Sequence, residues 1–369
     1  MPTPFDSLIS ALGRILTGLF SSLTRKLCVL ALDGTRVMRF DAQTGGFIDE
    51  FVAPQPQLRP RNAMCFGTDG HLLVPASKVG PPLPYALGVL RFSGTNGSLL
   101  DTFSSWPATA PGGDYDDPDC ATIGPDGHLY AGAASLNSTG GKPIYRFNGK
   151  TGAFIGIFVP GGSGGLQCPG TLTFGPDGNL YVRNCFAFGP RNGFDILRFD
   201  GKTGAFIDVF VTLDLGQLTV AAGMAFGSDG HLYVGDYTHL SVLRYDGATG
   251  VFIDEFVPTL EANHPCGMTF GPEGDLYVAN NGGGYSKPLY GNVSRYDGRT
   301  GALVQVYQRL GTNVMHPTDV LVTTMDIPFP NFSVGPDRVP RWLWVLAAVG
   351  LGTVIGRSIA PPASRNFRR

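Results

Sequence analysis

Three histidines on successive repeats of this sequence, His239, His264 and His316, are the residues best suited to hold a metal ion. Neutral imidazole nitrogens are good zinc ligands, and three of them leave a fourth coordination position open for water. His264 and His316 each precede a proline, so the alternative is that the His-Pro pair only begins a strand. The sequence thus predicts a candidate zinc site, with a structural role as the alternative.

A second candidate metal set ends segments of the form LYVxN or LYVxD, and its members are Asn184, Asp236 and Asn280. Carboxylate and amide oxygens suit Ca²⁺, and the acidic segment 114–119 adds negative charge on the same face. Asn and Asp side chains also cap turns routinely. Three other repeats carry alanine at this position, namely Ala31, Ala76 and Ala133. We therefore favour turn capping over a calcium site.

The six cysteines offer one pairing, because Cys168 and Cys185 flank a predicted hairpin almost symmetrically. A bridge between them would add on the order of 3 kcal/mol in an oxidising compartment, and two buried free thiols are the alternative. Cys266 lies close to His264, but the sequence has no nucleophile elbow, phosphate loop or dinucleotide fingerprint. Nucleophilic catalysis therefore has little support.

Two repeated phrases indicate the elements that position these residues. The first begins with Arg-Phe or Arg-Tyr and reads roughly RFDGKTGAFIDVF, with copies starting at residues 39, 91, 146, 198, 244 and 295. The second reads FGPDGNLYV, with copies at 66–74, 123–131, 174–182, 226–234 and 270–278. A period near 50 residues marks modular β architecture, in which each unit buries its apolar face against its neighbours.

One repeat, residues 168–211, shows the expected strands. Segments 171–174 and 180–182 flank Pro176-Asp177-Gly178, and segments 196–199 and 206–211 flank a second turn at 200–204. Tight turns between short apolar segments predict a four-stranded antiparallel meander, the blade of a β-propeller. The first repeat lacks its innermost strand, and we expect residues 315–325 to supply it. The sequence thus predicts an all-β, six-bladed propeller closed by its two terminal segments, with short terminal helices.

The phrases FGPDGNLYV and VLRYDGATG resemble the NHL repeat, found in six-bladed propellers and related to streptogramin-lyase-like and gluconolactonase-like propellers. The resemblance covers residues 27–325. It implies a scaffold, a receptor or an enzyme, and some lyases of this type use zinc. In such a fold, His71, His128 and His231 recur at one turn position on the face opposite the other three histidines, which indicates a structural or solvated role.

The C-terminal end of the chain predicts membrane association, whereas the N-terminal end predicts a helix that lies either on a membrane or against the propeller. Residues 1–26 carry apolar side chains at helical spacing and form the expected amphipathic helix. Residues 326–340 form a linker, and 341–369 contain the uncharged stretch 342–356 followed by a basic tail. That layout resembles a degenerate PEP-CTERM-type bacterial sorting signal. It implies a transmembrane or membrane-associated helix on an extracytoplasmic bacterial protein.

The composition limits the function classes. Charged residues make up 15% of the chain and the formal net charge is −2, which offers no electrostatic footprint for nucleic acid. We expect a non-enzymatic binding module for a protein or glycan ligand at the channel face. The alternative is a zinc- or calcium-dependent lyase or lactonase-like hydrolase at the channel mouth.

Overall fold

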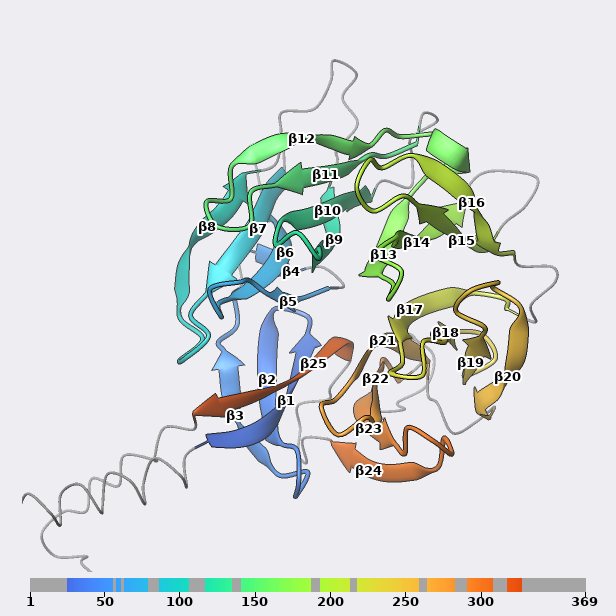
Figure 1. The fold of residues 1–369 in the computed structure, drawn as a ribbon. Coiled ribbons are helices and arrows are strands. Elements are labelled where there is room, and N and C mark those ends of the chain that lie inside the picture. Colours follow the sequence, from blue (N-terminus) through green and yellow to red (C-terminus); the bar gives the residue numbers. More distant parts are fainter. Residues whose placement is uncertain are drawn as a thin grey trace, which may run out of the picture. The chain divides into compact units, whose positions relative to one another are not determined.

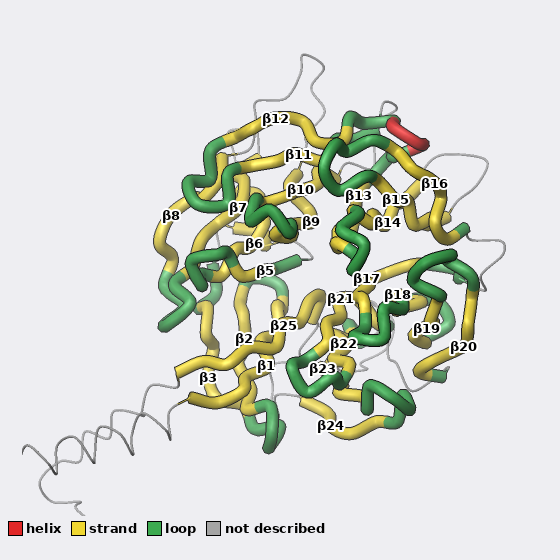
Figure 2. The backbone as a smooth tube through the Cα atoms, viewed as in Figure 1, coloured by secondary structure: helices red, strands yellow, loops and turns green. Residues whose placement is uncertain are grey.

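The computed structural model describes eleven segments of the chain: 25–55, 58–60, 63–78, 86–105, 117–134, 141–186, 193–212, 218–258, 264–282, 291–307 and 317–326. These residues form strands almost throughout, with one short 3₁₀ turn, η1 (Ser163–Gly165). The strands make six antiparallel sheets arranged around a central channel, as Figure 1 and Figure 2 show. The predicted six-bladed propeller is confirmed.

Blades 1 to 3 are given from the channel outward. Blade 1 contains β25 (Pro317–Asp326), β1 (Arg25–Asp33), β2 (Arg36–Asp41) and β3 (Phe47–Val52). Blade 2 contains β4 (Leu58–Pro60), β5 (Cys65–Phe66), β6 (Leu72–Lys78), β7 (Ala86–Phe92) and β8 (Leu99–Ser105). Blade 3 contains β9 (Asp117–Ile123), β10 (Leu129–Ala134), β11 (Ile144–Phe147) and β12 (Phe154–Val159).

Blades 4 to 6 repeat the same meander. Blade 4 contains β13 (Pro169–Phe174), β14 (Leu180–Phe186), β15 (Gly193–Phe199) and β16 (Phe206–Val211). Blade 5 contains β17 (Ala221–Phe226), β18 (Leu232–Asp236), β19 (Ser241–Tyr245) and β20 (Phe252–Val257). Blade 6 contains β21 (Pro265–Phe270), β22 (Leu276–Asn280), β23 (Asn292–Tyr296) and β24 (Leu303–Tyr307).

The ring closes as the sequence predicts. β25 pairs antiparallel with β1, from Arg25 opposite Asp326 to Leu32 opposite Asp319. Blade 2 departs from the regular pattern, because its inner position is shared by two short strands, β4 and β5, that both pair with β6. The expected terminal helices, 1–26 and 341–369, lie outside the described residues, except that Arg25 and Lys26 begin β1.

Aromatic side chains join each blade to the next. The ring of Tyr181 meets Phe210 of its own blade and Phe226 of blade 5 edge-on, with centroids 4.9 and 4.8 Å apart. Equivalent tyrosines in blades 3 and 5 make the same paired contacts. Because these rings are almost fully buried, the repeated tyrosine of the LYV phrase forms the apolar contact that stacks the blades.

In blades 1, 2, 4 and 5 the Arg of the repeated phrase fastens the outermost strand, whereas Arg146 and Arg295 pair with Asp126 and Asp275 instead. Arg198 on β15 donates from Nε and Nη2 to the two carboxylate oxygens of Asp208 on β16, at 3.0 and 2.5 Å. Its guanidinium also lies 4.9 Å from the ring centroid of Phe210. Such two-point Arg–carboxylate pairs orient both side chains, so the RF…TGAFID phrase specifies this strand pair.

Candidate ligand site in the central channel

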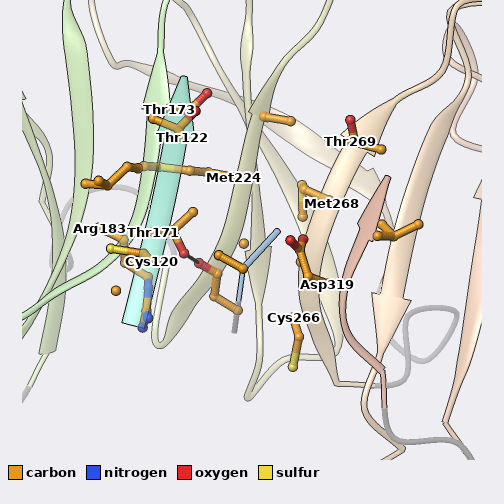
Figure 3. Close-up of a pocket in the computed structure, with 18 of the residues that line it drawn as sticks. Cys120, Thr122, Thr171, Thr173, Arg183, Met224, Cys266, Met268, Thr269 and Asp319 are labelled. Atoms are coloured by element: carbon orange, nitrogen blue, oxygen red, sulfur yellow. Dashed lines mark hydrogen bonds between the residues drawn. The ribbon is translucent and has the colours of Figure 1, made fainter. Parts of the chain in front are cut away.

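The innermost strands of all six blades line a cavity of about 540 Å³. Its wall carries threonine hydroxyls, cysteine thiols and methionine side chains, together with Arg183 and Asp319 (Figure 3). Ligand cavities in proteins typically measure about 300–1,000 Å³. The channel is therefore large enough for a small molecule.

Strand register identifies one equivalent position in every blade, which we call the channel layer. Its six members are Ala63, Cys120, Thr171, Gly223, Gly267 and Asp319. Five of these residues are small and uncharged, and Asp319 is the exception. Because the fold tolerates small residues at this position in five blades, a carboxyl group in blade 1 marks a departure from the repeat.

Asp319 lies deep in the channel. Its Oδ2 accepts a hydrogen bond from the backbone N–H of Met64 at 2.7 Å, which joins blade 1 to blade 2. Burial raises the pKa of Asp319 to about 7, while hydrogen bonds from the backbone of Met64 and Val320 oppose the shift. Gly267 makes room for it, because a Cβ there would lie 2.2 Å from Asp319 Oδ1.

Arg183 supplies a positive charge at the same depth. It lies on β14 directly opposite Thr171, a member of the channel layer. Its guanidinium covers the backbone of Gly170, where a Cβ would come within 1.7 Å of Nη2, and Nη1 is 3.4 Å from the Ala221 carbonyl oxygen. The other blades carry uncharged residues at the Arg183 position, namely Leu32, Pro75, Gly132, Gly235 and Ala279.

Arg183 and Asp319 therefore face the cavity from opposite walls. They belong to blades 4 and 1, which lie across the channel from each other in the ring (Figure 1), and Figure 3 shows the two side chains on either side of the cavity. Neither residue was identified from the sequence. Comparing each strand of one repeat with the others would have revealed both, as charges at positions that are otherwise uncharged.

The channel thiols are poor nucleophiles. Burial raises the pKa of Cys65 to about 12, with the nearby Asp319 adding to the shift, and raises that of Cys266 to about 11. Burial also raises the pKa of Cys120. Because the thiolate is the reactive form, these three groups favour packing over covalent catalysis near neutral pH.

The structure describes two of the three predicted zinc ligands, His239 and His264. His264 begins blade 6 with its ring 4.7 Å from that of Tyr237, and burial lowers its pKa. His239 is half-exposed, with Nδ1 3.3 Å from Asp236 Oδ2. His316 lies outside the described residues, so the trio remains a prediction. Within the described segments, no group of three or more His, Cys, Asp or Glu residues could hold a metal ion.

Two of the three predicted calcium ligands cap backbone N–H groups of their own blades, and the third bonds side chains on the neighbouring strand. Asn184 Oδ1 accepts from the backbone N–H groups of Gln167 and Cys168 at 2.7 and 3.2 Å. Asp236 Oδ2 accepts from the backbone N–H of Thr219 at 2.7 Å. Asn280 Nδ2 donates to Asn292 and Ser294, at 2.9 and 3.0 Å. These contacts agree with the favoured capping role for Asn184 and Asp236 but not for Asn280, and calcium binding stays a prediction.

The strand register corrects one position in the comparison of the repeats, the residue of blade 1 that is equivalent to Asn184. In blade 1 the equivalent of Asn184 is Asp33, not Ala31, because Asp33 pairs with Pro317 as Asn184 pairs with Pro169. Asp33 is bound by Arg36 at 2.9 Å. The misplacement arose because the first repeat lacks the FGPDG phrase that sets the register elsewhere. Of the acidic segment 114–119, only 117–119 is described, and Asp119 is buried.

Cys168 and Cys185 are adjacent, as predicted from the hairpin. The backbone N–H of Cys185 donates to the Cys168 carbonyl at 3.0 Å, and both thiols are free. The Cys168 thiol donates to Cys185, and together with Arg183 it lowers the pKa of Cys185 to about 7, against the effect of burial. The same contact raises the pKa of Cys168. The disulfide remains a prediction.

The other three histidines have the structural role expected. Nδ1 of His71, His128 and His231 accepts the backbone N–H of Gly94, Gly149 and Gly247, at 3.2, 3.3 and 3.4 Å. Asn179 and Asp275 accept the equivalent glycine N–H in blades 4 and 6. A side-chain acceptor at this position therefore ties together the two turns on one side of blades 2 to 6.

Solved structures with the same fold include enzymes and a protein complex. A chain of the nidogen/laminin complex matches with a TM-score of 0.59 and 13% identity, over 80% of this chain and 98% of that one. A gluconolactonase from Xanthomonas campestris matches with a TM-score of 0.48 and 16% identity, over 67% and 76% of the two chains. Virginiamycin B lyase from Staphylococcus aureus matches with a TM-score of 0.44 and 16% identity, over 78% and 90%.

The nidogen/laminin match shows a likeness of fold alone. The structures found include a gluconolactonase and a lyase, the two kinds of propeller named in the expected resemblance. No protein-family model matches the sequence, and no curated protein matches it. Within the described residues, no helix has the length and apolar character needed to cross a membrane. The predicted amphipathic segment 1–26, apart from its last residues, and the hydrophobic segment 341–369 lie outside that part of the chain.

Proposed function

We propose that this protein is a non-enzymatic binding module whose ligand occupies the central channel. The ligand is a small molecule, or a terminal residue of a protein or glycan partner that reaches into the cavity. The observation that supports this is the pair of charged exceptions, Arg183 and Asp319, on opposite walls of a cavity of about 540 Å³. A concave cavity with a few convergent polar groups favours ligand binding.

The described residues also favour binding over chemistry. Arg183 and Asp319 stand on opposite walls, and the channel thiols are held in their protonated form. Covalent catalysis needs a nucleophile activated by a nearby base, whereas burial keeps the Cys65 and Cys266 thiols in the less reactive protonated form.

A thermal-shift screen of the full-length protein tests this proposal. The compounds are sugars, organic acids, amino compounds and short peptides. Thr173 lines the cavity, so Thr173→Phe fills it, whereas Val304 on the outermost strand of blade 6 is half-exposed. We expect at least one compound to raise the Tm of the wild type and of Val304→Phe by several degrees, but not that of Thr173→Phe. A screen without any channel-dependent ligand would contradict the proposal.

The metal-dependent alternative has its own test. Metal analysis of the purified protein would detect stoichiometric zinc or calcium, and a His239→Ala, His264→Ala, His316→Ala triple variant would lose zinc if these residues are ligands. Stoichiometric metal that depends on the histidines would favour the lyase or lactonase-like hydrolase. We expect the wild type and the triple variant to contain equal, substoichiometric amounts.

We further propose that residues 341–369 associate the propeller with a bacterial membrane, with the propeller on the extracytoplasmic side. The support is the uncharged stretch 342–356 between Arg341 and Arg357, with tryptophans near its start and a basic tail after it. Fractionation of cells expressing the full chain and a variant lacking 341–369 tests this. Recovery of both proteins in the same soluble fraction would contradict membrane association.

A further inference from the structure

We propose that the channel ligand is a small linear zwitterion, whose carboxylate binds Arg183 and whose ammonium group binds Asp319. This inference rests on the proposed binding function and specifies the class of ligand. It follows from the position of the two charges, the chemistry of each wall and the uncharged wall between them.

The positive wall suits a carboxylate. Arg183 presents a planar guanidinium that lies against the backbone of Gly170, with Nη1 3.4 Å from the Ala221 carbonyl oxygen, so its position is held by the backbone beside it. Guanidinium groups bind carboxylates through two parallel N–H donors, which gives both strength and direction. Gly170 is required for this arrangement, because any side chain there would displace the guanidinium.

The negative wall suits a hydrogen-bond donor. The Asp319 carboxyl receives backbone N–H groups of Met64 and Val320, and an ionised carboxylate has about four acceptor sites. Asp319 lines the cavity, where a ligand can reach its carboxyl group. An ammonium group has three donors and one positive charge, so it suits these acceptor sites and offsets the cost of holding Asp319 ionised in the channel.

The wall between the charges suits an unbranched aliphatic chain. Cys120, Thr171 and Gly223 keep the channel layer free of bulk, and the side chains of Met224 and Met268 add apolar surface. Methionine side chains adapt to flexible apolar ligands. A ligand with opposite charges at its ends also adds no net charge to the cavity.

The binding should depend on pH through Asp319. Its pKa of about 7 means that the carboxyl is substantially protonated below neutrality. The titratable and charged groups near it are Cys65 on β5 and Cys266 on β21, both protonated near neutral pH, with Arg183 affecting Cys266 from the opposite wall. Affinity for an ammonium group therefore rises as the pH increases from about 6 to 8.

Isothermal titration calorimetry on the full-length protein tests the inference. The probes are linear ω-amino acids from glycine to aminooctanoate, with n-alkanoates and n-alkylamines of the same chain lengths as monopolar controls. We expect one ω-amino acid to bind at least about tenfold more tightly than both of its matched controls. That preference should increase with pH.

Variants assign each end of the ligand. Arg183→Gln should reduce affinity for the alkanoate and the ω-amino acid by about tenfold or more, and Asp319→Asn should do so for the alkylamine and the ω-amino acid. Asp319→Asn should leave alkanoate binding unchanged. A general loss of structure would instead weaken alkanoate binding as well. Lys202 is exposed on the turn between β15 and β16, away from the channel strands, so Lys202→Gln is the control for a change of charge alone.

The outcomes separate this inference from the binding function. If an alkanoate or an alkylamine binds as tightly as its matched ω-amino acid, the proposal that the ligand is a zwitterion is wrong. The proposed binding function is then still supported. The zwitterion proposal is also wrong, and the binding function is still supported, if no ω-amino acid binds but another compound binds the wild type and not Thr173→Phe. If no compound shows channel-dependent binding, both proposals are wrong.

Discussion

Asp319 shows how burial changes a single side chain. An exposed carboxyl needs no partner to remain ionised, but in the channel its pKa rises from an ordinary 3.8 to about 7. The folded protein therefore binds this proton more tightly than the unfolded chain does. The stability that results is fully present below about pH 4 and is lost as the pH rises through about 7.

Replacing Asp319 by Asn should remove that dependence. The amide oxygen keeps the hydrogen bond from Met64 but does not ionise. We expect the free energy of unfolding of Asp319→Asn, relative to the wild type, to increase by about 2 kcal/mol between about pH 5 and pH 8. Urea unfolding at intervals across this range measures the difference. A constant difference at all pH values would show that Asp319 does not titrate there.

Cys185 should be the most reactive described thiol near neutral pH. The Cys168 thiol and Arg183 stabilise its thiolate, whereas burial keeps Cys65, Cys120 and Cys266 protonated. We expect iodoacetamide to modify Cys185 at least about tenfold faster than those three at about pH 7.5. Mass spectrometry of digests at successive times measures the rates.

A variant pair checks the cause of that reactivity. Cys168→Ala should slow the modification of Cys185, because it removes the hydrogen-bond donor, whereas Cys266→Ala should not. Oxidised glutathione should join the pair through thiol–disulfide exchange, which forms the Cys168–Cys185 bond and reduces the oxidant. A pair that stays reduced after this treatment would contradict the predicted disulfide.

At the scale of the element, the turn glycines serve two different purposes. Gly178 and Gly204 both adopt positive φ, at 78° and 73°. A Cβ on Gly178 would meet nothing within 4 Å, whereas one on Gly204 would lie 2.0 Å from the carbonyl oxygen of Phe158 in blade 3. Gly204 is therefore needed for close contact between blades, and Gly178 only for the turn.

Alanine substitutions should separate these purposes. We expect Gly178→Ala to cost about 1–2 kcal/mol, which is the usual penalty for a left-handed backbone. Gly204→Ala should cost at least about 2 kcal/mol more, because backbone atoms of the neighbouring blade must move. Denaturant unfolding measures both values. Equal costs would mean that the blades adjust without strain.

Blade architecture is predictable from sequence because the same residues make the same contacts in successive blades. Arg198 with Asp208 and Tyr181 with Phe226 recur as a repeated phrase, so one repeat specifies the rest. The charged channel residues do not recur. Arg183 and Asp319 are single departures, and only the pairing of each strand with its neighbours places them at one depth.

The histidines illustrate the same distinction. His128 could be interpreted from sequence, since it recurs at a turn and its Nδ1 accepts a backbone N–H. His264 could not, since its contact with Tyr237 joins two blades whose loops differ in length. A side chain set by the repeat is predictable, whereas one set by a unique loop depends on tertiary packing.

For the whole molecule, closure of the ring joins the most distant parts of the chain. β25 completes blade 1, and the Tyr307 hydroxyl of blade 6 donates to the Ala42 carbonyl of blade 1 at 2.8 Å. We expect Tyr307→Phe to cost about 1–3 kcal/mol, because it leaves a buried carbonyl without this donor. Tyr181→Phe, whose hydroxyl bonds Asp177 within one blade near solvent, should cost less. Thermal unfolding of both variants checks this order.

The channel layer has an evolutionary consequence. Its six positions contribute one residue from each blade, while the tyrosines, arginines and turn glycines that hold the blades together lie elsewhere. Point mutations at Ala63 can therefore alter the cavity while those blade contacts are kept, whereas a side chain at Gly223 would lie 1.9 Å from the Cys266 carbonyl oxygen of blade 6. An ancestral propeller could therefore change its ligand preference through substitutions in the channel layer of one blade at a time.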